Sequence, residues 1–150
     1  MSINVLVLEN QADFRKTLCE HIRVAGYRPK EALTLQEINP LISRLHFLAA
    51  VVDVRMKDDK DPHDWSGLVE ARLIAGSKVP VIILSAYDSA EDVERAYTVS
   101  FKELAPRAFI SKNSDWPVRL KEELAKIRAE QPHGWSIRLK DFLDGLVSPK

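Results

Sequence analysis

Four polar residues stand directly after short apolar runs that are spread over most of the chain. They are Glu9 after INVLVL, Asp53 after FLAAVV, Ser85 after VPVIIL and Lys112 after RAFIS. Two acids, a hydroxyl and a lysine therefore follow four runs of the same kind. Of all the patterns in the sequence, this one says most about chemistry.

This set of groups suits phosphoryl transfer. A carboxylate such as Asp53 can attack a phosphoryl donor and carry the group as a mixed anhydride. Because the transferred group is strongly anionic, its oxygens need positive charge and hydrogen-bond donors around them. Lys112 can supply the charge, Ser85 the hydroxyl, and Glu9 an oxygen ligand for a divalent cation. Each residue alone has an ordinary explanation as a turn former, helix cap or surface side chain, and only the joint placement favours a site.

The apolar runs predict the strands that must position these groups. Three of the four are almost continuously apolar, which is typical of parallel strands buried on both faces. A weaker strand is expected near residues 27–33. Stripes of helical spacing fill the gaps, in the sets Phe14, Leu18, Ile22, Ala25; Leu35, Ile38, Ile42, Leu45; and Leu120, Leu124, Ile127. Capping-box patterns at 34–37 and 88–91 and a glycine at 26 mark helix ends.

This alternation of strand and helix, repeated five times, predicts a doubly wound α/β sheet with right-handed crossovers. In such an open sheet, ligands bind beyond the carboxyl ends of the strands. We therefore expect the four polar residues to lie on one rim of the sheet.

Composition narrows the range of functions. A chain of 150 residues is expected to form one domain with a sizeable core. Lys+Arg and Asp+Glu both count 22, so no basic excess indicates a nucleic acid or anionic membrane partner. The apolar runs are too short to span a bilayer, and MSINVLVLEN lacks the features of a signal peptide, so we expect a cytoplasmic protein. Cys19 is the single cysteine, which excludes an internal disulfide.

Residues 3–128 resemble the receiver domain of two-component response regulators. The resemblance rests on Glu9, on Asp53 with Met56 three residues later, on Ser85 followed by Ala86, and on Phe109 three residues before Lys112. It implies a flavodoxin-like five-stranded parallel sheet with strand order 2-1-3-4-5. It also implies phosphotransfer to Asp53 from a histidine kinase or phosphotransfer protein, in a signalling domain that is not itself an enzyme.

The resemblance further assigns roles around Asp53. Lys112 and Ser85 would assist the chemistry, and Ser85 with Phe109 would form the switch that reshapes an interaction face. Magnesium would be the cofactor. Its ligands would be Glu9, Asn10, Asp53 and the backbone carbonyl of Arg55.

Several residues depart from the family pattern. Asn10 stands where a second acid is usual, so the metal site loses one negative charge, and Arg55 adds a fixed cation nearby. Asn113 replaces the usual cis-proline after Lys112, and a cis bond before Asn costs about 3 kcal/mol. The segment between Asp53 and the glycine at 67 is longer than usual. We therefore expect weakened magnesium binding.

The C-terminal segment predicts one more helix. After a break at PHG, apolar residues step by 4, 3 and 4, at Trp135, Leu139, Phe142 and Leu146. We therefore divide the chain into a receiver domain at 1–131 and an amphipathic extension at 132–150. The extension is expected to pack on the domain, to form a homodimer or to lead to an effector. Because no output domain is visible, a downstream protein target is expected.

Three functions compete at this stage. The first is a phosphate-accepting receiver, supported by Asp53, Ser85 and Lys112. The second is a divergent pseudo-receiver that binds proteins without phosphorylation, favoured by Asn10 and Asn113. The third is a different α/β protein. We set it aside because ENQADF is not a flavodoxin phosphate loop, and because the candidate nucleophile follows the third predicted strand and not the first, as it would in a haloacid-dehalogenase-type phosphatase.

Overall fold

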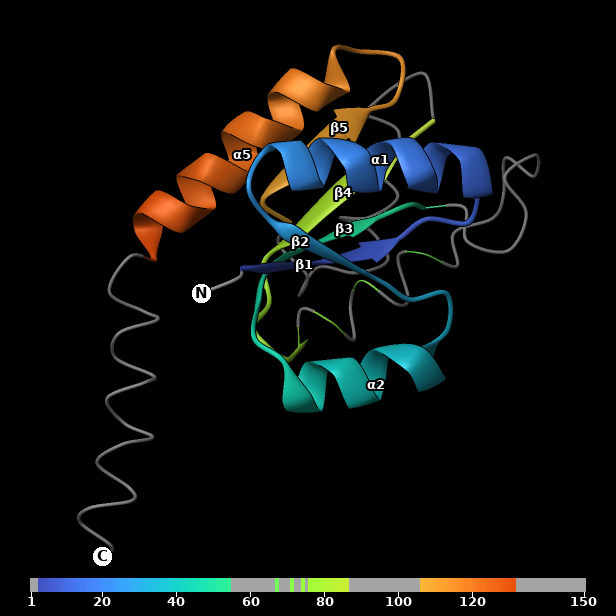
Figure 1. Ribbon diagram of the computed structural model, residues 1–150, viewed down its shortest axis with the longest axis vertical. Coiled ribbons are helices and arrows are strands. Elements are labelled where there is room, and N and C mark those ends of the chain that lie inside the picture. The colour runs from blue at the N-terminus through green and yellow to red at the C-terminus, as the bar shows by residue number, and fades with distance from the viewer. Residues whose placement is uncertain are drawn as a thin grey trace, which may run out of the picture.

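The computed structural model describes residues 3–54, 67, 71, 74, 76–86 and 106–131, and only the backbone of Leu35. Strands and helices alternate along the chain as the sequence predicts (Figure 1). The strands are β1 (Asn4–Leu8), β2 (Arg28–Glu31), β3 (Phe47–Val52), β4 (Val81–Ser85) and β5 (Ala108–Ser111). The helices are α1 (Ala12–Val24), α2 (Leu35–Arg44) and α5 (Trp116–Glu130). The helices predicted between β3 and β4 and between β4 and β5 fall mainly outside the described residues.

The strands form one parallel sheet in the order β2-β1-β3-β4-β5, which confirms the predicted fold class. Val7 of β1 pairs with Glu31 on one side and Val51 on the other, and Ser85 pairs with Ser111. Because every strand runs the same way, all the carboxyl ends meet at one edge of the sheet. That edge lies on the right in Figure 1.

The core lies on both faces of the sheet. One cluster joins α2, through Ile38, to side chains of the central strands such as Leu6 and Ile83. The other cluster joins α1 and α5 to the opposite face, and both of these helices lie on the same side of the sheet in Figure 1. All six residues of β3 and all five of β4 are buried. Burial on both faces explains why these runs are continuously apolar in the sequence.

The helix ends follow the sequence signals. Thr34 caps α2, since its Oγ1 accepts the backbone N–H of Glu37, and the Glu37 carboxylate accepts the N–H of Thr34 in return. The predicted capping box is thus confirmed. Gly26 follows α1 with φ of 98°, a left-handed conformation that favours glycine and ends the helix there.

Three expectations are not addressed by this fold. The C-terminal helix at 132–150, the domain boundary before it and the capping box at 88–91 lie outside the described residues. Among the residues that are described, no helix is long and apolar enough to cross a membrane.

Candidate functional site

Two carboxylates lie side by side at the carboxyl edge of the sheet. Glu9 follows β1 and Asp53 follows the neighbouring strand β3, and they are 1% and 3% exposed. The backbone N–H of Asp53 donates to the carbonyl of Leu8 at 2.8 Å, which joins the two strand ends. Burial, and then the negative charge of Asp53, raise the pKa of Glu9 to about 7, against the lowering effect of Lys112. The ionised form of Glu9 is therefore costly in this site unless a cation lies beside it.

Lys112 brings positive charge to both acids. Its Nζ lies 2.9 Å from Oε1 of Glu9 and 3.6 Å from Oδ2 of Asp53, and its side chain is 10% exposed. Its backbone N–H donates to the carbonyl of Ser85 at 2.7 Å. Residues from the ends of four strands thus meet as the sequence predicts. One detail differs: Ser85 is the last residue of β4, where the sequence placed it just after the strand.

The turn after Lys112 is held by Ser111. The hydroxyl of Ser111 accepts the backbone N–H of Asn113 at 3.1 Å, and its carbonyl accepts both the N–H and the hydroxyl of Ser114. The bond between Lys112 and Asn113 is trans. The chain therefore builds this turn from serine hydrogen bonds in place of a cis-proline.

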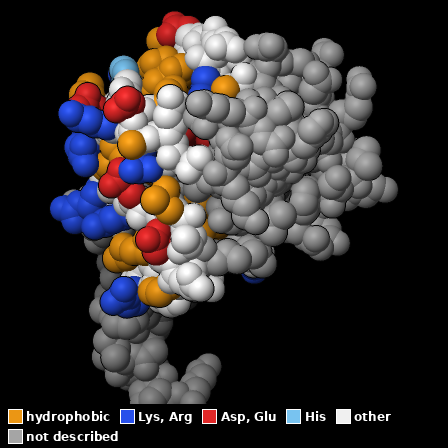
Figure 2. Space-filling model, turned by 90° about the vertical axis from the view of Figure 1, so that its right-hand side faces the viewer, with side chains coloured by type: hydrophobic (Ala, Val, Ile, Leu, Met, Phe, Trp, Pro, Cys, Tyr) orange, Lys and Arg blue, Asp and Glu red, His pale blue; other side chains and the backbone are white. Residues whose placement is uncertain are grey.

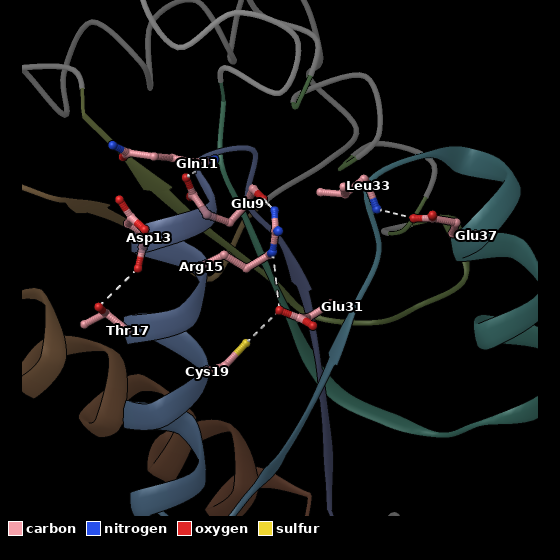
Figure 3. Close-up of polar contacts among 9 residues, drawn as sticks. All are labelled: Glu9, Gln11, Asp13, Arg15, Thr17, Cys19, Glu31, Leu33 and Glu37. Atoms are coloured by element: carbon pink, nitrogen blue, oxygen red, sulfur yellow. Dashed lines mark hydrogen bonds and ion pairs between the residues drawn. The ribbon is translucent and has the colours of Figure 1, made fainter.

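The backbone at Glu9 is fixed from α1 and β2. Oε1 of Glu9 accepts the N–H of Gln11 at 3.2 Å, and Nη1 of Arg15 donates to the Glu9 carbonyl at 2.9 Å. Nε of the same arginine lies 3.3 Å from the Glu31 carboxylate, so Arg15 bridges the end of β1 and the end of β2 (Figure 3). The sequence gives no sign of this role, because Arg15 looks like any basic residue of an amphipathic helix.

Gly67 is a second residue that sequence reasoning missed. Its N–H donates to the carbonyl of Val54 at 2.9 Å. A Cβ at this position would lie 1.7 Å from the backbone oxygen of Asp53. Only a glycine allows the backbone to pass so close to the candidate phospho-acceptor. In the sequence it reads merely as the end of a long polar segment.

Ser85 and Phe109 share one face of the sheet. Phe109 pairs with Ile83 of β4, and Ser85 lies two residues beyond Ile83. Because side chains alternate along a strand, Ser85, Ile83 and Phe109 all project to the same side. Ser85 is buried, and the ring of Phe109 is half-buried against the cluster that includes Ile83.

The donor set suits a hard divalent cation. Glu9 and Asp53 offer buried carboxylate oxygens whose negative charges repel one another, and Asn10, which is half-buried and follows Glu9 in the sequence, carries an amide oxygen. Oxygen ligands of this kind are those that magnesium prefers. The described residues contain no group of three or more His, Cys, Asp or Glu that could hold a metal, so a cation here would depend on amide and backbone oxygens as well. Arg55, the fourth predicted contributor, lies outside the described residues.

Figure 2 looks onto this edge of the molecule. Acidic and basic side chains are interspersed over the described part of that face. This mixture agrees with the zero net charge of the chain.

No protein-family model matches the chain, and no curated protein matches it. Solved structures do. The signal receiver domain of a signal transduction histidine kinase from Syntrophus aciditrophicus is 20% identical with a TM-score of 0.65, over 86% of this chain and 92% of that one. A CheY-like response regulator receiver domain protein from Methanospirillum hungatei JF-1 is 18% identical with a TM-score of 0.64, over 87% of this chain and 99% of that one.

A third structure holds a metal. It is the receiver domain of a sensor histidine kinase from Pseudomonas aeruginosa PAO1, with a magnesium ion coordinated in the active site cleft. It is 17% identical with a TM-score of 0.60, over 84% of this chain and 97% of that one. At these identities the likeness shows the fold. The chain has the fold of response regulator receiver domains, as its resemblance to that family predicts.

Proposed function

We propose that the protein is a receiver domain that accepts a phosphoryl group on Asp53 from a histidine kinase or phosphotransfer protein. The observation that carries this proposal is the contact of one largely enclosed lysine, 10% exposed, with two buried acids. Lys112 Nζ lies 3.6 Å from Asp53 Oδ2 and 2.9 Å from Glu9 Oε1. Glu9 thereby holds the ammonium within reach of any group that becomes attached to Asp53.

The chemistry follows from these positions. A carboxylate oxygen of Asp53 bonds to phosphorus while the bond from phosphorus to the donor histidine nitrogen breaks. Lys112 then pairs with a phosphoryl oxygen, and Ser85, buried at the end of β4, donates its hydroxyl to another. Glu9, Asp53 and Asn10 would hold magnesium, which would supply further positive charge to the phosphoryl oxygens.

A switch at Ser85 and Phe109 would report the modification. Both side chains project from the same face of the sheet. When the Ser85 hydroxyl moves toward the phosphoryl group, it leaves room into which the Phe109 ring can turn. A local charge thus biases a two-state element at the surface near β5. The protein acts in this scheme as a cytoplasmic signalling domain and not as an enzyme, and its output passes to a downstream protein or a homodimer.

The experiment is intact-mass spectrometry after incubation with a small acyl phosphate and magnesium. The wild-type chain should gain one phosphoryl group, and Asp53→Asn should abolish the gain. Asp13→Asn is the matched control, because Asp13 is an exposed acid of α1. This variant should gain the group as the wild type does.

The alternative is a pseudo-receiver that binds a protein partner without phosphorylation. Asn10 favours it, since a weaker metal site would slow phosphotransfer. A wild-type chain that stays unmodified by both the small donor and a cognate kinase would replace the first proposal by this one.

A further inference from the structure

The ammonium of Lys112 lies against an aromatic ring. Its Nζ is 4.3 Å from the centroid of Phe14, which lies in the first turn of α1. A cation within about 6 Å of a ring face is attracted by the negative charge of that face. The sequence does not reveal this contact, because Phe14 looks there like one member of an apolar helical stripe.

A second ring supports the first. Trp116 begins α5 and is 8% exposed, and its centroid lies 5.0 Å from that of Phe14 at an interplanar angle of 48°. His21 of α1 meets the same indole almost edge-on, at 5.1 Å and 78°. These separations are typical of aromatic pairs that attract one another. Phe14 is therefore fixed by α5 as well as by its own helix.

The three described contacts of the ammonium come from three elements. Lysine has three N–H donors. Lys112 directs its charge to Glu9 after β1, to Asp53 after β3 and to the Phe14 ring on α1. Its side chain is only 10% exposed, so the ring occupies a side on which water would otherwise solvate the charge.

We propose that Phe14 is a positioning residue that holds the Lys112 ammonium against Glu9 and Asp53. A lysine stem is long and flexible, and without the ring its head could turn toward solvent. The Phe14 ring is also a partner that the Lys112 ammonium can leave easily. The ring attracts a cation more weakly than an anion does, so the ammonium can turn from the ring to a phosphoryl group while it keeps its bond to Glu9. The catalytic benefit of Phe14 rests on the proposed function, whereas the position of Lys112 does not.

The first test reads the position directly, in the unmodified full chain. A proton that lies over a ring is shifted upfield in NMR, so the ε-methylene protons of Lys112 should be upfield of those of the other lysines. Their signal is assigned by its loss in Lys112→Arg. Phe14→Leu should return it to the ordinary lysine position, and Phe14→Tyr should preserve the shift because it keeps the ring. An ordinary shift in the wild-type chain would overturn the proposal.

The second test reads the chemistry. Phe14→Leu should slow labelling of Asp53 by a small acyl phosphate about 3- to 10-fold, the size expected from one partly buried cation–π contact. Phe14→Tyr should label near the wild-type rate. Ile22→Val is the control for lost packing, because Ile22 is buried in the same core cluster and belongs to the same helix. It should lower the denaturation midpoint without slowing the reaction.

The outcomes separate the two proposals. If the wild-type chain is never labelled, the phosphorylation proposal fails and the NMR shift alone decides whether Phe14 positions Lys112. If the chain is labelled and Phe14→Leu reacts at the wild-type rate, the positioning role is wrong although the phosphorylation proposal stands. An equal slowing in Ile22→Val would also overturn it, because the effect would then follow stability and not the ring.

Discussion

The ionised form of Glu9 is disfavoured by the surroundings of its carboxylate. Burial and the neighbouring Asp53 raise its pKa from 4.5 to about 7, even with Lys112 bonded to it. Between these two pH values the folded protein retains a proton that the unfolded chain has released. The free energy of unfolding must therefore fall as the pH rises through this window.

The first prediction follows from this balance. Without magnesium, the wild-type chain should be less stable at pH 8 than at pH 5 by about 2 kcal/mol from this group. Glu9→Gln removes the charge and keeps the shape, so its unfolding free energy should change less over the same range. Urea unfolding at both pH values measures the difference. The control is Glu20→Gln at an exposed position of α1, and if it flattened the dependence equally, Glu9 would not be the cause.

Asn10 sets the strength of the proposed metal site. It adjoins Glu9 at the rim and offers an uncharged amide oxygen. Asn10→Asp adds one negative charge beside two others, so it should tighten magnesium binding and speed the labelling of Asp53. Isothermal titration with magnesium, at a pH above 7 where Glu9 is ionised, gives the affinity. Unchanged affinity would mean that residue 10 does not face the metal.

At the scale of elements, the central strands could be predicted because a strand that is buried on both faces has a continuous run of apolar residues. FLAAVV and β3 coincide, and β4 and β5 lie within two residues of their predicted runs. The short strand β2, with the sequence RPKE, has no apolar run, because it lies at the edge of the sheet and two of its residues are exposed. Spacing alone located it only as a weak strand within 27–33.

The supporting contacts of the site could not be predicted in this way. Glu9, Asp53, Ser85 and Lys112 were found because topology places all strand ends together. Arg15, Phe14 and Gly67 act by contacts between elements, and their residue types are common on any helix or turn. The orientation of α1 over the sheet decides which of its side chains reach the carboxyl edge. The 3.6-residue spacing of apolar residues predicts the helix but not this orientation.

Gly67 gives a prediction at this scale. Gly67→Ala would drive a methyl group into the backbone carbonyl of Asp53, which cannot move without shifting the end of β3. We expect a loss of roughly 1–3 kcal/mol in the free energy of unfolding, as for other overpacked sites, and slower labelling of Asp53. Gly76→Ala is the matched control, since a Cβ there meets no atom within 4 Å. Equal effects of the two variants would show that the close approach at Gly67 is unimportant.

For the whole molecule, the sheet separates two surfaces that could carry a signal. The face with α2 also holds Ser85 and Phe109, and the opposite face holds α1 and α5. Lys112 belongs to the rim between them and touches both Asp53 and Phe14. Movement of the Lys112 side chain would therefore change contacts on both sides of the sheet.

The corresponding prediction concerns which residues change their environment when Asp53 is phosphorylated. Backbone NMR shifts between the free and phosphorylated chain should concentrate in residues 85–112, as the switch at Ser85 and Phe109 requires. A stable phosphoryl analogue added to Asp53→Asn serves as the control for nonspecific binding. Shifts confined to 57–66 would contradict this route.

Cys19 offers a chemical probe of how firmly α1 is held on the sheet. It is the one thiol of the chain, 2% exposed in α1, with its Sγ 3.6 Å from a carboxylate oxygen of Glu31 (Figure 3). Burial, and then the Glu31 charge, raise its pKa to about 11, so an alkylating reagent finds almost no thiolate at neutral pH. We therefore expect the rate at which iodoacetamide modifies Cys19 to report the fraction of molecules in which α1 has opened locally and exposed the thiol. Glu31 also pairs with Arg15, and Arg15 donates a hydrogen bond to the carbonyl of Glu9. Alkylation of Cys19 should therefore become slower when a ligand binds at Glu9 and stabilises these contacts.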